Sequence, residues 1–181
     1  RIRSVAPDPF DLPIDLGTTQ AFLDLVTGIE GGVLMVNVGG RTLLIIPNLL
    51  SVGLDVTITG SDQLLVVDLD ALHAVGGNID ISGNLAMTTL DLSSLVTVGG
   101  SLNIAGDPSL SAILVSGVTS IGGDLTILGT AATGINLGAL TTVGGNLDLS
   151  GNTSASAINA GALTTVGGSL TIDNNTAADP I

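Results

Sequence analysis

The sequence contains no cysteine, tryptophan, tyrosine or lysine, and only two phenylalanines. Without cysteine, a disulfide framework and a zinc–thiolate site are both excluded. Three arginines face 16 acidic residues, for a net charge of −13. Nucleic-acid phosphates need a basic surface, and an anionic membrane surface repels an acidic protein. We therefore expect neither a nucleic-acid partner nor binding to an anionic membrane.

Aliphatic residues and glycine dominate what is present. Hydrophobic residues make up 45% of the 181 residues, and there are 26 glycines. So much aliphatic surface requires burial, which argues against disorder, and the length is that of one domain. The apolar run 125–147 is rich in Gly, Thr and Asn and belongs to a repeat, so we expect no membrane insertion.

Glycine pairs recur at a nearly constant spacing. Six Gly-Gly dipeptides, with Gly53-Leu54 in the one gap, have first residues 22 or 23 positions apart, at 31, 53, 76, 99, 122, 144 and 167. Such self-similarity indicates a repeat architecture. The period is shorter than that of helical repeats, and the apolar residues alternate as they do in strands.

Each repeat carries six aliphatic positions that are predicted to point inward. Two form an alternating pair after the glycines: Leu34/Val36, Val56/Ile58, Ile79/Ile81, Leu102/Ile104, Leu125/Ile127, Leu147/Leu149 and Leu170/Ile172. Two more form a second alternating pair: Leu44/Ile46, Val67/Leu69, Leu90/Leu92, Ile113/Val115, Ile135/Leu137 and Ile158/Ala160. The last two are single columns, which run from Leu49 to Leu163 and from Val52 to Val166.

No single repeat can bury six aliphatic side chains, whereas stacked repeats bury them continuously. The sequence therefore predicts an all-β fold, a parallel β-solenoid of about seven 22–23-residue coils. We expect a single domain in which residues 1–30 form an arm, a strand and a capping helix and residues 31–181 form the coils. The short helix is predicted over Thr18 to Val26, where the apolar residues share one face.

A glycine closes the first strand of most coils, and a short polar residue follows it. Repeated corners need glycine where φ is positive or where the next backbone comes close. The polar residues can bond the backbone of the turn and stack from coil to coil. We interpret this column as a structural ladder rather than a ligand site: Ser61, Asn84, Asp107, Thr130, Asn152 and Asn175.

The segment from Gln20 to Val36 resembles the opening of a receptor L domain, and Leu140 to Asn152 resembles an internal coil of that family. The resemblance covers roughly Phe10 to Asn175. Receptor L domains are leucine-rich-repeat-like β-solenoids of growth-factor receptor ectodomains, fungal cell walls and prokaryotic surface proteins. The resemblance therefore implies a right-handed parallel β-solenoid fold and an extracellular or cell-surface location.

No pattern in the sequence indicates catalysis, a cofactor or a metal site. The single histidine, His73, is interpreted as a solvent-facing spacer. Calcium needs converging oxygens in fixed columns, and the outward column lacks a run of Asp: Thr57, Asp80, Asn103, Thr126, Asp148 and Thr171. Asn152 and Asn174 match the pattern for possible N-glycosylation.

We expect a non-enzymatic, extracellular structural protein, a surface or filament-forming solenoid. An adhesion or ligand-binding module and an ice-binding solenoid are the alternatives. The seventh coil has only its first strand, so its open edge predicts head-to-tail assembly with copies of the chain, unless a cap lies beyond Ile181. The residues assigned to that contact are Phe10, Leu12, Ile14, Leu16, Leu170 and Ile172.

Overall fold

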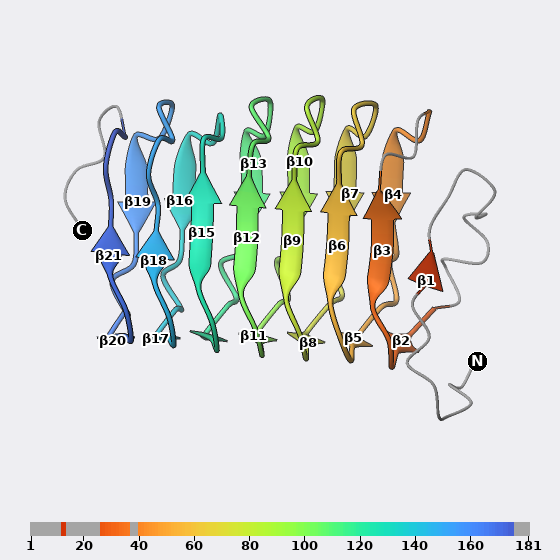
Figure 1. Cartoon of the computed structure of the whole chain (residues 1–181), viewed down its shortest axis with the longest axis horizontal. Coiled ribbons are helices and arrows are strands. Elements are labelled where there is room, and N and C mark those ends of the chain that lie inside the picture. Colours follow the sequence, from red (N-terminus) through yellow and green to blue (C-terminus); the bar gives the residue numbers. More distant parts are fainter. Residues whose placement is uncertain (1–11, 14–25, 37–39, 176–181) are drawn as a thin grey trace.

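The computed structural model describes residues 12–13, 26–36 and 40–175. Within them the fold is an all-β solenoid in which parallel strands of successive coils lie side by side along a rod (Figure 1). Every strand pairing in it is parallel, between strands 22 or 23 residues apart in most cases. The predicted β-solenoid is thus confirmed. The predicted helix over Thr18 to Val26 lies outside the described residues, apart from its last residue.

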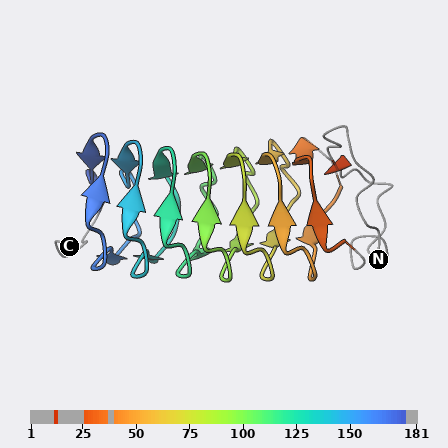
Figure 2. The same ribbon diagram turned by 90° about the horizontal axis from the view of Figure 1, so that it is seen from below.

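Three faces surround the interior of the rod, as the view from below shows (Figure 2). Sheet A consists of β1 (Leu12–Pro13), β3 (Val33–Val36), β6 (Val56–Thr59), β9 (Ile79–Ser82), β12 (Leu102–Ala105), β15 (Leu125–Leu128), β18 (Leu147–Asp148) and β21 (Leu170–Thr171). Sheet B consists of β2 (Gly28–Ile29), β5 (Ser51–Val52), β8 (Ala74–Val75), β11 (Thr97–Val98), β14 (Ser120–Ile121), β17 (Thr142–Val143) and β20 (Thr165–Val166).

The third face is divided between two sheets. Sheet C consists of β4 (Leu43–Ile45), β7 (Val66–Asp68), β10 (Thr89–Asp91) and β13 (Ala112–Leu114), and sheet D of β16 (Gly134–Asn136) and β19 (Ala157–Asn159). The chain visits the three faces in the order B, A, and then C or D. Each complete coil therefore contributes one strand to each face. Equivalent aliphatic residues of successive coils thus lie next to one another and form columns.

The aliphatic columns form one continuous core. The four-residue strands of sheet A alternate between buried and half-buried residues, as one-sided strands do. A further inward column lies in the stretch that the sequence pattern left as variable. Its members are at most 1% exposed and follow the corner glycines: Leu64, Met87, Leu110, Ala132 and Ala155.

The predicted register of the first coil is wrong by one residue. Val33 pairs with Val56 and is 1% exposed, so the inward column begins at Val33, one position before the predicted Leu34. A Cβ atom added to Gly53 would meet the carbonyl oxygen of Glu30, which places Glu30, and not Gly31, in the first glycine column. All four residues of β3 are apolar, so alternation could not fix their register.

The two glycine columns have different physical reasons. At Gly99, a Cβ atom would lie 2.2 Å from the carbonyl oxygen of Gly76 in the preceding coil, so only glycine permits the coils to stack. At Gly83, φ is 67°, in the left-handed region that L side chains rarely adopt, and a Cβ atom would meet nothing closer than 3.8 Å.

A seam separates sheets C and D, and we call it the β13/β16 seam. Gly106 and Ile113 are seven positions apart, whereas Gly129 and Ile135 are six apart, so the later turn is one residue shorter. Within the described chain, no bond from the Val115 N–H continues the series of ladder bonds Ile46 N–Asp68 O, Leu69 N–Asp91 O, Leu92 N–Leu114 O and Leu137 N–Asn159 O. One missing residue thus interrupts one face while sheets A and B run on.

Candidate functional site

The predicted corner column forms a buried polar ladder, at most 4% exposed from Ser61 to Asn152. Each amide side chain accepts a hydrogen bond from the backbone N–H of the preceding coil. The Oδ1 of Asn84 accepts from Ser61 N at 3.0 Å, and the Oδ1 of Asn152 accepts from Thr130 N at 3.1 Å. The Nδ2 of Asn84 donates to the carbonyl oxygen of Ile58 at 2.9 Å. These bonds satisfy polar groups that would otherwise be costly in the core.

Asp107 is the one acid among the residues of the buried ladder. Its Oδ1 accepts from Asn84 N at 2.7 Å, whereas its Oδ2 is buried without a hydrogen-bond partner. Burial raises the pKa of Asp107 to about 6, against the hydrogen bonds from Asn84 that lower it, and the nearby charge of Asp80 raises it further.

A second ladder, which the sequence pattern did not lead us to expect, lies on the surface beside the glycine pairs. Here each side chain accepts from the N–H of the following coil, opposite to the buried ladder. The Oδ1 of Asp124, for example, accepts from Asn146 N. The signal was present in the sequence as a short polar residue directly after most glycine pairs: Asp55, Asn78, Ser101, Asp124, Asn146 and Ser169.

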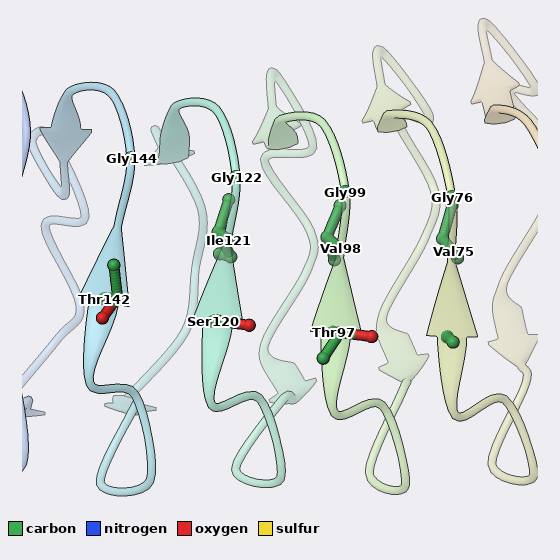
Figure 3. A pocket seen from close by; sticks show the side chains of 11 residues that line it. Val75, Gly76, Thr97, Val98, Gly99, Ser120, Ile121, Gly122, Thr142 and Gly144 are labelled. Carbon is green, nitrogen blue, oxygen red and sulfur yellow. The ribbon is translucent and has the colours of Figure 1, made fainter.

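A shallow groove of about 530 Å³ runs over sheet B. Figure 3 shows Thr97, Ser120 and Thr142 on successive strands, next to the glycine column that contains Gly99 and Gly122. Glycines, which carry no side chain, form part of its lining. Its described lining contains hydroxyl, aliphatic and glycine residues only, without a titratable group.

Acidic residues end two strands of sheet C, β7 and β10. Asp68 and Asp91 pair in register, and each accepts the N–H of the residue two positions later, Asp70 and Ser93 respectively. Burial raises the pKa of Asp68, with smaller increases from Asp70 and Asp91. Among the described residues, no three His, Cys, Asp or Glu side chains come close enough to hold a metal ion.

His73 lies on the surface, as the sequence pattern predicted. Its backbone N–H bonds Leu50 in the preceding coil, its exposed ring Nδ1 lies 2.6 Å from the carbonyl oxygen of Ala71, and Val96 occupies its place in the next coil. In the coils that follow, the equivalent threonines use their hydroxyls internally. Thr141 and Thr164 each donate to the carbonyl of the preceding coil at 2.9 Å.

Of the residues assigned to assembly, the structure describes Leu12, Leu170 and Ile172, which lie at or next to the two end strands of sheet A. Leu12 pairs with Val33 of its own chain, so β1 covers the first coil. Leu170 is 53% exposed on β21, and Ile172 packs partly against the core. Phe10, Ile14 and Leu16 lie outside the described residues.

The two glycosylation candidates differ in accessibility. Asn152 is fully buried, and its Nδ2 donates to the carbonyl oxygens of Ile127 and Leu149 at 2.8 and 3.1 Å. A glycan on that nitrogen does not fit the folded chain, which argues against Asn152 as an acceptor. Asn174 is exposed and stays a prediction.

Comparison with known proteins adds no relative. No protein-family model, no curated protein and no solved structure matches the chain. Within the part of the chain that the structure describes, no helix has both the length and the apolar character needed to cross a membrane. The class defined by the structure is therefore that of a parallel β-solenoid.

Proposed function

We propose that this protein is a non-enzymatic, extracellular structural solenoid that assembles head to tail with copies of itself. The observation that carries the proposal is the exposure of apolar residues on the last coil that the structure describes. Leu163, Val166 and Ile172 are only partly buried there, and Leu170 is 53% exposed. The equivalent Leu147, one coil earlier, is fully buried. An exposed apolar strand edge favours pairing with a further strand.

A second copy of the chain, stacked on this edge, would offer one strand to each face. Sheets A, B and D end with β21, β20 and β19, and sheets A, B and C begin with β1, β2 and β4. Stacking one copy on the next would continue each face with a parallel strand of the same kind. Such a contact is heterologous and grows into a filament when its rotation does not close.

High acidity and the receptor L-like coil motif support the extracellular part of the proposal. With a net charge of −13, copies of the chain repel one another. The same repulsion predicts that added salt promotes association, since it screens the charge.

The test is the size distribution of the purified chain over a wide concentration range, by light scattering and electron microscopy. We expect growth with concentration in the full chain, loss of growth in Leu170→Asp, and unchanged growth in Leu114→Asp. Leu114 is a matched control, 43% exposed on the side wall of the rod. Particles of one monomer at every concentration, or assembly of Leu170→Asp like the parent, would overturn head-to-tail assembly.

A separate experiment removes residues 1–16 and tests whether the N-terminal arm provides the contact between copies. We expect the truncated chain to lose assembly while it keeps the circular dichroism of the coils. If it assembles like the full chain, donation of β1 to the neighbouring copy is wrong, and the contact is made by the coils themselves.

A further inference from the structure

The buried polar ladder contains one mismatch between donors and acceptors. Asn84 and Asn152 each turn Oδ1 toward a backbone N–H and Nδ2 toward a backbone carbonyl, that of Ile58 in the first case and Ile127 in the second. Asp107 keeps the Oδ1 contact, at 2.7 Å from Asn84 N, but has an oxygen where the amides have a nitrogen.

The register of sheet A identifies the carbonyl that corresponds to this oxygen. Ile58 pairs with Ile81, and Ile81 pairs with Ile104. Because Asn84 bonds the carbonyl of Ile58, the equivalent group for Asp107 is the carbonyl of Ile81. A carboxylate oxygen and a carbonyl oxygen are both acceptors, so only a proton between them allows the ladder pattern to continue.

We propose that Asp107 binds a proton on Oδ2 in the folded solenoid, and that this proton stabilises the fold beside the β13/β16 seam at low pH. The carboxylic acid then donates where an asparagine would donate, and the buried ladder is complete up to that coil. When the proton leaves, a buried charge remains, and its Oδ2 has no hydrogen-bond partner to stabilise it.

The position next to the seam makes this proton important for the fold. Among the described residues, no side chain bonds the Asp107 N–H from the following coil, where Thr130 instead bonds Asn152 at 2.8 Å. The ladder is thus broken between Asp107 and Thr130, at the same coil boundary where sheet C ends. Ionisation of Asp107 therefore weakens its contacts with the preceding coil, directly beside the coil boundary that has the fewest ladder bonds.

The charges around Asp107 determine the direction of the pH effect. Asp80 on β9 is the charged group that acts on it and favours the protonated form, whereas its ladder neighbours Asn84 and Thr130 are neutral. The pKa of Asp107 in the fold, about 6, exceeds the ordinary value of 3.8. The stabilisation is therefore complete below the ordinary value and is lost as the pH rises through about 6.

The experiment compares urea unfolding of the parent and of Asp107→Asn from about pH 4 to about pH 8. Asparagine supplies the donor at every pH. We expect the ratio of the two unfolding equilibrium constants to change about a hundredfold over this range, with its midpoint near the folded pKa. Asp124→Asn, the same change in the exposed surface ladder, is the matched control for the chemical substitution itself.

A direct titration keeps the test decisive if Asp107→Asn fails to fold. The carboxyl carbon resonance of Asp107 in the parent protein, assigned by nuclear magnetic resonance, is expected to titrate about two pH units above an ordinary aspartate. A midpoint at the ordinary value, or a ratio of unfolding constants that is independent of pH, would overturn the proposal. Neither readout depends on head-to-tail assembly.

Discussion

Replacing Gly99 with alanine is the sharpest test of how the coils stack. The new Cβ atom would lie 2.2 Å from the carbonyl oxygen of Gly76 and 3.0 Å from its carbonyl carbon. Ordinary contacts between carbon and oxygen are about 3.3 Å or longer, so the two coils must separate locally by about 1 Å. The carbonyl oxygen and carbon of Gly76 are backbone atoms, so no side-chain rotation can relieve the contact.

The free-energy cost follows from the bonds at this corner. Gly99 N donates to Val75 O at 2.9 Å, and Gly100 N donates to Gly77 O at 2.8 Å. Losing both costs about 2 kcal/mol, and the distorted packing adds about 1–3 kcal/mol. Alanine also lowers the conformational entropy of the unfolded chain, which offsets less than about 1 kcal/mol of this cost. We expect a net loss of about 3 kcal/mol, or roughly 6–12 °C in melting temperature.

Gly129→Ala is the matched control for this prediction. The chemical change is identical, but φ at Gly129 is 64° and a Cβ atom there would meet nothing within 4 Å. The only cost is the left-handed backbone, about 1–2 kcal/mol before the same gain from the unfolded chain. Equilibrium unfolding in urea measures both variants. If Gly99→Ala is no more destabilising than Gly129→Ala, steric stacking does not explain the first glycine column.

Two further substitutions test other columns. Leu95 is fully buried, so Leu95→Asp leaves an unpaired charge in the core and is expected to cost several kcal/mol; an unchanged melting curve would refute its place in the inward column. His73 is exposed, so His73→Ala is expected to leave the free energy of unfolding within about 0.5 kcal/mol of the parent, and a larger loss would show a structural role that its position does not suggest.

The sequence was sufficient for the architecture because its signals agree with one another. The glycine period, the two-residue alternation and the need to bury aliphatic residues all lead to stacked coils. Asn84 and Asn152 were predicted to belong to a structural ladder, and their side chains bond the backbone of neighbouring coils. The column that contains Met87 escaped notice because its members range from alanine to methionine and because Ala132 lies one residue closer to its corner glycine than the others do.

The direction of each ladder, toward the preceding or the following coil, could not be predicted from the sequence for a different reason. An amide side chain can accept from either neighbouring coil, and the choice depends on where the corner backbone points its N–H groups. Asn84 accepts from the preceding coil, whereas Asn78 accepts from the following one. The two residues have the same chemistry and lie six positions apart. Only the backbone path around the corner distinguishes the buried ladder from the surface ladder.

Two 22-residue spacings in the glycine pattern have different physical origins. The step between Gly122 and Gly144 is real, because Ser120 pairs with Thr142. The step between Gly31 and Gly53 does not correspond to the structural repeat, because Glu30, and not Gly31, occupies the glycine column. β2 is the first strand of sheet B, so among the described residues no earlier strand of that sheet stacks against the coil of Glu30, and stacking does not require glycine there. The preceding coil thus determines whether a position in this column must be glycine. The first coil has no such neighbour among the described residues, so the glycine pattern predicts its register least well.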